Sequence, residues 1–391
     1  MTPAARLQAA VEILDLVVQS ARDQGAPADA IVTRYFKTRR YAGSKDRRAV
    51  RELVFRAIRR TGEQPESGRA AILGLVQDDP DLVGLCGQPR GPEALRQDEP
   101  ASPASLIPEW LVPELSPLVT PGEWPALLER APVDLRVNIA RTTREEMLRE
   151  FPGSVATRLS PWGLRLPSDT RVDEADASRN GLVEVQDEGS QLIALACDPR
   201  PGQRLLDLCA GAGGKSLALA AAAPGATLLA TDSNRARLSK LPHRAERAHA
   251  AIETRLLSPP RELAELEDWR GAADLVLVDA PCSGSGTWRR NPEARWRGTP
   301  ERLDRLVSAQ ERLLDIAADL VKPGGSLVYA VCSLLAREGA GQIESFLGRG
   351  SDWVAQDSPE GAGRPDGCGR LLTPAHDATD GFFIARLIKP C

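Results

Sequence analysis

The C-terminal half of the sequence alternates between short apolar runs and helical patterns, and this rhythm constrains the fold more than any other feature. Strand patterns occur at residues 204–208, 227–231, 273–278 and 326–331. Helical patterns follow them at 216–223, 235–249, 301–321 and 339–347. Such alternation is typical of an α/β fold with a mostly parallel sheet and helices on both faces. A last apolar run at 381–387 is expected to join the edge of that sheet.

The N-terminal half is organised differently, as expected of a 391-residue chain that is too long for one core. Apolar residues recur at helical spacing within residues 4–60, where Ser44 is an expected helix N-cap. Proline and glycine break the helical pattern over residues 61–105, apart from a short helix at 70–76. The sequence therefore predicts a helical domain with a Pro/Gly-rich linker at 1–105, a small α+β module at 106–180 and the sheet domain at 181–391.

Composition narrows the class of protein. The net charge is −4 and no apolar run is long enough to cross a bilayer. The N-terminus lacks a signal-peptide pattern, and the seven cysteines are scattered, so we expect free thiols and a cytoplasmic location. The three histidines form no metal-ligand pattern, so no metal is expected. Nothing indicates an oligomer, and a monomer is assumed.

A glycine-rich turn at residues 209–215, Cys-Ala-Gly-Ala-Gly-Gly-Lys, lies between a strand pattern and a helix pattern. Glycine allows a ligand to approach the backbone, and the helix N-terminus offers free N–H groups. A P-loop would need glycine where Cys209 stands, and a dinucleotide turn would need a third glycine where Ser216 stands. The spacing therefore favours S-adenosylmethionine as the cofactor.

Asp232 ends the next strand pattern, 21 residues after Gly211, at the place where a carboxylate accepts hydrogen bonds from ribose hydroxyls. A helix N-cap is the alternative role for this residue. Because it follows the glycine turn, the ribose role is favoured.

Two cysteines, Cys282 and Cys332, each lie just past a strand pattern, in the segments Asp279-Ala-Pro-Cys and Tyr329-Ala-Val-Cys. Neighbouring strand ends can share a pocket, where one thiolate would be a nucleophile and a second thiol would assist. A disulfide or two inert buried thiols is the alternative. A thiolate that adds to carbon 6 of cytosine makes carbon 5 reactive toward a sulfonium methyl group, and Asp279 is placed to protonate or hydrogen-bond ring N3.

Together these motifs resemble the bacterial 16S ribosomal RNA cytosine-5 methyltransferase family. The matching segments stand in the family's order at 185–192, 206–215, 279–290, 328–333 and 379–384. Weaker matches at 43–47 and 51–55 resemble the helical NusB-like RNA-binding domain of the same enzymes. The resemblance implies a Rossmann-like methyltransferase domain that methylates carbon 5 of a cytosine, with small-subunit ribosomal RNA as the expected partner.

The resemblance also implies residue roles. Cys332 matches the nucleophile, and Cys282 matches the cysteine that promotes product release. The matched S-adenosylmethionine-binding positions are Cys209, Ala210, Gly211, Ala212, Gly213, Gly214, Lys215, Asp232 and Asp279. The chain departs from the family where Gly211 and Ala212 replace Ala-Pro, which makes the turn more flexible, and where Val331 replaces threonine.

An Arg- and Trp-rich segment follows the Asp-Ala-Pro-Cys motif, and aromatic faces and Arg planes grip unstacked bases. The predicted RNA contacts are Trp288, Arg289, Arg290 and Arg295. A packed loop with tryptophan in the core is the alternative. A second Arg cluster at 34–60 either contacts RNA or is paired with acidic side chains.

Two rival functions stay open from the sequence. One is the same chemistry on transfer RNA. The other is a non-catalytic RNA-binding assembly factor, which the altered glycine turn would suit.

Overall fold

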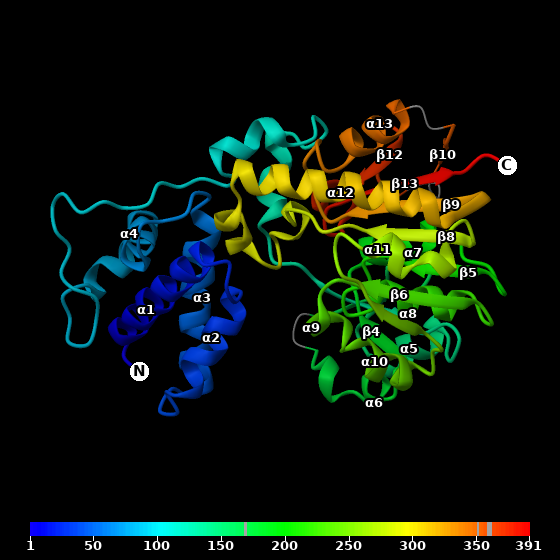
Figure 1. Cartoon of the computed structure of the whole chain (residues 1–391). Helices are drawn as coiled ribbons and strands as arrows, with labels where there is room; N and C mark the ends of the chain where they lie inside the picture. Colours follow the sequence, from blue (N-terminus) through cyan, green and yellow to red (C-terminus); the bar gives the residue numbers. More distant parts are fainter. Residues whose placement is uncertain (168–169, 350–351, 358–361) are drawn as a thin grey trace. The chain divides into compact units, whose positions relative to one another are not determined.

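The computed structural model describes residues 1–167, 170–349, 352–357 and 362–391, and it divides into two units (Figure 1). The first unit comprises Met1–Leu115, Thr120–Glu129 and Thr287–Pro300. The second comprises Ser116–Val119, Arg130–Gly286 and Glu301–Cys391. The sequence predicted three parts. That division stays a prediction; by contact, most of residues 106–129 group with the helices, and residues 130–180 group with the large sheet.

The first unit is built from helices α1 (Pro3–Arg22), α2 (Ala28–Lys37), α3 (Ser44–Arg60) and α4 (Gly68–Asp78). Their apolar faces form one core, in which residues at helical spacing such as Leu7, Leu14 and Val54 are fully buried. Ser44 is the first residue of α3 rather than its cap. Gly43 is the N-cap, and its N–H donates to Asp46 Oδ2 at 3.2 Å.

The segment 287–300 belongs to this helical unit and is held there by buried polar contacts. Arg295 is 2% exposed and donates to the carbonyl oxygens of Ile58 (2.6 Å), Thr61 (3.3 Å) and Leu106. Burial lowers the pKa of this guanidinium to about 9. Trp296 Nε1 also donates to Thr61 O at 2.8 Å. The carbonyls that end α3 are therefore satisfied by side chains from far along the chain.

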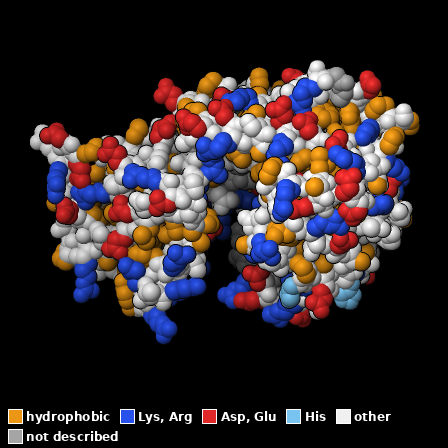
Figure 2. All heavy atoms as spheres, in the orientation of Figure 1, with side chains coloured by type: hydrophobic (Ala, Val, Ile, Leu, Met, Phe, Trp, Pro, Cys, Tyr) orange, Lys and Arg blue, Asp and Glu red, His pale blue; other side chains and the backbone are white. Residues whose placement is uncertain are grey.

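Arginines of the 34–60 cluster form ion pairs within the helical unit. The pairs join Arg39 to Glu12, Arg51 to Asp29, Arg56 to Asp79 and Arg60 to Asp78. On the face shown in Figure 2, Lys and Arg side chains are interspersed with Asp and Glu. These four arginines therefore fit the second interpretation of the cluster, in which its arginines are paired with acidic side chains.

The second unit contains a nine-stranded sheet in the order β11-β12-β13-β9-β8-β5-β6-β7, with β10 paired to β13. The strands are β5 (Arg204–Asp207), β6 (Thr227–Asp232), β7 (Glu253–Leu256), β8 (Ala273–Asp279), β9 (Val321–Val331), β10 (Val354–Gln356), β11 (Arg364–Asp366), β12 (Gly369–Leu372) and β13 (Phe382–Ile388). Strands β9, β8, β5, β6 and β7 are parallel, as the alternation predicted. The expected edge position of the last strand is wrong, because β13 lies between β9 and β12.

The helices of this unit are α7 (Glu188–Ala196), α8 (Gly214–Ala222), α9 (Arg235–Leu238), α10 (Leu241–Ala248), α11 (Glu262–Glu265), α12 (Pro300–Leu320), α13 (Ala340–Gly348) and α14 (Pro374–Asp377). The single helix predicted at 235–249 is two helices, α9 and α10. Pro242 at the start of α10 has no N–H to continue the hydrogen-bond ladder from α9, which explains the break.

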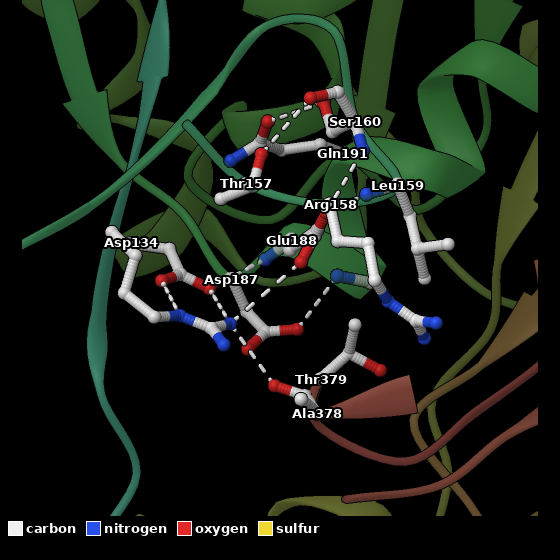
Figure 3. Close-up of polar contacts among 12 residues, drawn as sticks. Asp134, Thr157, Arg158, Leu159, Ser160, Asp187, Glu188, Gln191, Ala378 and Thr379 are labelled. Carbon is white, nitrogen blue, oxygen red and sulfur yellow. Dashed lines mark hydrogen bonds and ion pairs between the residues drawn. The ribbon is translucent and has the colours of Figure 1, made fainter. Parts of the chain in front are cut away.

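A four-stranded antiparallel sheet, in the order β2-β3-β1-β4, completes the second unit. Its elements are β1 (Val133–Val137), α5 (Arg144–Glu150), β2 (Val155–Ala156), β3 (Gly163–Leu166), α6 (Asp176–Arg179) and β4 (Val183–Val185). Figure 3 shows the polar contacts at its junction with α7. Asp134 accepts from Arg165 (2.8 and 2.9 Å), and Glu188 Oε1 accepts from Ser160 N (2.8 Å). Asp187 accepts from Asp380 N at 3.1 Å, which ties the predicted segments 185–192 and 379–384 together.

Within the described residues, no helix is long and apolar enough to cross a membrane. Nor do those residues contain a group of three His, Cys, Asp or Glu side chains able to hold a metal ion.

Replacing Arg295 with Met should lower the free energy of unfolding by about 2 to 4 kcal/mol, because buried carbonyls lose their donor. Urea denaturation of the full chain measures the change. Arg297→Met is the matched control, because Arg297 bonds to Gly25 and Ala26 from a partly exposed position. Equal losses for the two variants would contradict a special role for Arg295.

Candidate functional site

The predicted glycine turn joins β5 to α8. Gly211 and Gly213 have φ angles of 58° and 84°, in the left-handed region that favours glycine. A Cβ at Gly213 would lie 2.1 Å from Leu241 Cδ1, so no larger residue fits there without repacking. The sequence thus predicted both the turn and its need for glycine.

Side chains from three other elements hold this turn. Asp232 Oδ2 accepts from Gly211 N at 2.7 Å. Arg244 of α10 donates to Ala212 O, and Arg136 of β1 donates to Gly214 O, each at 2.5 Å. These three bonds constrain a turn that lacks the proline usual in the resembled family.

Asp232 is buried at the end of β6, and it does not cap a helix. Its Oδ1 accepts from Asn234 N at 2.6 Å. Asn234 is itself the N-cap of α9, accepting from Arg237 N at 3.1 Å. The N-cap alternative therefore falls to Asn234, while the ribose role of Asp232 stays a prediction.

Lys215 and Asp279 form an ion pair beside the turn, with Nζ and Oδ2 2.7 Å apart. Burial lowers the pKa of Lys215, but the attraction of Asp279 outweighs it and the net shift is upward. Asp279, the residue predicted to act on ring N3 of cytosine, thus has a cationic neighbour.

Asp207 is a fully buried carboxyl at the end of β5, and Ser216 Oγ donates to its Oδ2 at 2.6 Å. Burial raises the pKa of Asp207 to about 7, and the nearby charge of Asp279 adds to the rise. Cys209 lies two residues on, and burial also raises the pKa of its thiol.

The two predicted cysteines meet at the ends of β8 and β9. Their Sγ atoms are 3.3 Å apart, and neither forms a disulfide. The strands are parallel and pair Asp279 with Ala330, so the loops that follow them begin side by side at the carboxyl ends of the strands. The hydrogen bond with Cys332, followed by burial, raises the pKa of Cys282. Cys282 is thereby held as a thiol beside Cys332.

The C-terminal segment packs against the loop after Cys282. Gly286 N donates to Cys332 O at 3.0 Å, and Gly381 N donates to Gly286 O at 2.8 Å. A Cβ at Gly286 would lie 2.0 Å from Gly381 O. This close approach explains why glycine occupies both positions, and it fixes the loop between β9 and the start of β13.

The predicted RNA contacts are divided by their exposure. Trp288, Arg289 and Arg295 are 2%, 7% and 2% exposed, whereas Arg290 is partly exposed. The packed-loop alternative therefore describes the first three, whose faces are not open for stacking on bases in this structure. For Arg290, an RNA contact stays a prediction.

Several polar residues that line the site were not singled out from the sequence. They are Glu338, Ser283, Ser333, Gln310, Asp207, Arg136 and Arg244. Glu338 stands in the polar run Ala-Arg-Glu-Gly, which reads as an exposed loop, although the side chain is fully buried. Asp207 interrupts the apolar strand pattern at 204–208 with a charge, and that position was the one available signal.

Comparison with known proteins agrees with this geometry. The model of the family "16S rRNA methyltransferase RsmB/F" matches residues 194–388. Ribosomal RNA small subunit methyltransferase B of Enterobacter sp. is 33% identical over 81% of this chain and 75% of its own length. The chain belongs to this methyltransferase family.

Other relatives are similar over shorter spans. Ribosomal RNA small subunit methyltransferase B of Xylella fastidiosa is 38% identical over 68% of this chain, and the match spans 62% of that relative's length. A methyltransferase homolog protein from Pyrococcus horikoshii is 26% identical, with a TM-score of 0.60 over 68% of this chain and 89% of its own. The Rossmann-like fold class is thereby confirmed.

The Asp207→Asn substitution should change how stability depends on pH. A carboxyl whose pKa is about 7 when folded and about 4 when unfolded makes wild-type stability fall as pH rises through that window. The Asn variant lacks this titration, so its Tm relative to wild type should increase between pH 5 and pH 8. Thermal melting at the two pH values measures it, and an equal Tm difference at both would contradict the shifted pKa.

Proposed function

We propose that this chain transfers a methyl group from S-adenosylmethionine to carbon 5 of a cytosine in RNA. The observation that carries the proposal is the 3.3 Å approach of Cys282 and Cys332 at the edge of the sheet where the glycine turn and Asp279 also lie. Ligands of open α/β sheets bind at that edge. Membership of the family supports the same reaction.

The residues of the turn suit S-adenosylmethionine. Gly211 and Gly213, with their positive φ angles, present backbone rather than side chains at the carboxyl ends of the strands. The carboxylate of Asp232 lies beside this backbone, because it accepts a hydrogen bond from Gly211 N. Asp232 would hold the ribose, and the turn from Cys209 to Lys215 with Asp279 would hold the rest. When bound, the cofactor supplies an electrophilic methyl group.

Cys332 is the proposed nucleophile, and its thiolate forms a bond to carbon 6 of the cytosine. This addition makes carbon 5 electron-rich enough to accept the methyl group. Solvent water then accepts the carbon 5 proton, and the electron pair of that C–H bond restores the carbon 5–carbon 6 double bond and expels the Cys332 sulfur as a thiolate. Cys282, held as a thiol 3.3 Å away, is proposed to donate a hydrogen bond to that sulfur as it leaves.

Small-subunit ribosomal RNA is the proposed substrate, since the relatives at 33% and 38% identity carry that substrate in their names. The target base must be single-stranded or turned out of its helix, since carbon 5 and carbon 6 react from the ring face. Bisulfite sequencing of total RNA, with and without this protein, should show one lost 5-methylcytosine in 16S RNA. Loss from a transfer RNA, or no loss, would favour one of the two rivals.

Substituting the cysteines one at a time should separate their roles. Cys332→Ala should abolish methylation and covalent capture of RNA, because the nucleophile is gone. Cys282→Ala should accumulate a protein–RNA adduct, because elimination slows while addition proceeds. Denaturing gels with labelled RNA measure both. Normal turnover by Cys282→Ala would show that its assigned role is wrong. Cys197→Ala is the control, because Cys197 is a buried cysteine at the end of α7.

A further inference from the structure

Glu338 is a fully buried carboxylate that the reaction as described does not use. It lies between β9 and α13, six residues after Cys332. Its Oε1 accepts from Ser283 N at 2.8 Å and from Gln310 Nε2 at 2.9 Å. Its Oε2 accepts from the hydroxyls of Ser283 and Ser333, both at 2.5 Å. Four donors therefore compensate one buried charge.

The two serines give these contacts their significance, because each directly follows one of the cysteines. Ser283 stands next to Cys282, and Ser333 stands next to Cys332. The two hydroxyls are also 3.2 Å apart, so the carboxylate and both serines form one cluster. The Glu338 side chain thus binds both cysteine-bearing loops at the residue that directly follows each cysteine.

Further bonds fix Glu338 itself. Tyr329 OH donates to its carbonyl oxygen at 2.7 Å, from near the C-terminal end of β9. Gln310 of α12 donates to both the carboxylate and Pro281 O, each at 2.9 Å. Glu338 is therefore held at its backbone by the strand that precedes Cys332 and at its carboxylate by α12.

We propose that Glu338 is the positioning residue of the cysteine pair, setting the separation of the two thiols through Ser283 and Ser333. The catalytic meaning of this inference rests on the proposed function, whereas the positioning itself does not. Removing the carboxylate should let the two loops part and should weaken the sulfur–sulfur contact.

Electrostatics adds a consequence that can be measured. The negative charge of Glu338 contributes to the raised pKa of Cys282, after the larger effects of Cys332 and burial. Two further titratable groups interact with the pair, Lys215 with Cys332 and Tyr329 with Cys282. Loss of the Glu338 charge should therefore lower the pKa of Cys282 and make its thiolate more available.

Two substitutions separate the charge from the hydrogen bonds. In Glu338→Gln, the amide oxygen can still accept from Ser283 N and Gln310, while the amide N–H groups donate to the two hydroxyls, which accept as well as donate. The cluster is thus retained without its charge. Glu338→Ala removes both the charge and the bonds.

The test is the rate of alkylation of each cysteine by iodoacetamide between pH 6 and pH 10, resolved by peptide mass spectrometry on the full chain without RNA. For Glu338→Gln, Cys282 should react about threefold faster or more at pH 8. For Glu338→Ala, both cysteines should react faster and RNA methylation should fall about 100-fold or more, with cofactor affinity unchanged. Wild-type alkylation profiles in both variants would overturn the proposal.

Glu262→Gln is the matched control, because Glu262 is also buried but pairs with Arg312 between α11 and α12. It should leave both alkylation profiles at wild-type values. If Glu338→Ala fails to fold, Ser283→Ala and Ser333→Ala each remove one hydroxyl contact to Glu338, and each should speed alkylation of the cysteine that precedes it. Because alkylation requires no methyl transfer, it decides the positioning claim even if the chain proves inactive on RNA.

Discussion

Parallel pairing of β8 with β9 is the constraint on which the rest of the site depends. In the parallel register, Val278 opposes Tyr329 and Asp279 opposes Ala330, so the two chains leave the sheet side by side. Two loops that are 50 residues apart in sequence then place their sulfur atoms 3.3 Å apart. An antiparallel pairing would send the same loops to opposite ends of the sheet. The cysteine pair is therefore a product of topology and not of local sequence.

Hydrogen bonds from distant elements then convert that topology into a defined geometry. Asp232, Arg244 and Arg136 hold the glycine turn from β6, α10 and β1, in a chain that lacks the turn's usual proline. Glu338 holds the two cysteine loops in a comparable way. In both places, backbone conformation is fixed by buried polar contacts, each of which is expensive to leave unpaired.

Local patterns in the sequence predicted the parts of the fold that local patterns determine. The glycine turn, the parallel strands and the positions of both cysteines follow from periodicity and from the order of motifs. Three features did not follow. The break between α9 and α10 depends on Pro242, β13 lies inside the sheet because its neighbours are set by long-range pairing, and Arg295 is buried because carbonyls at the end of α3 need a donor. The helix break is local to Pro242, whereas the position of β13 and the burial of Arg295 depend on partners far away in the chain.

Two buried charged side chains show most clearly what the sequence alone does not predict. Glu338 and Arg295 occupy polar stretches that resemble surface loops, and only the folded chain shows that hydrogen bonds satisfy them. A sequence reading assigns such residues to solvent because charged side chains are seldom fully buried. Their burial here marks two of the places where segments distant in the sequence are joined.

The central claim is that the sulfur of Cys332 bonds to a cytosine during methyl transfer. It is tested most directly with RNA that carries 5-azacytidine, whose ring nitrogen at position 5 has no proton to lose, so that elimination cannot follow addition. Digestion of the trapped complex and tandem mass spectrometry should find the nucleotide mass on the peptide that contains Cys332. An adduct on Cys282 instead, or none on either cysteine while methylation proceeds, would contradict the account.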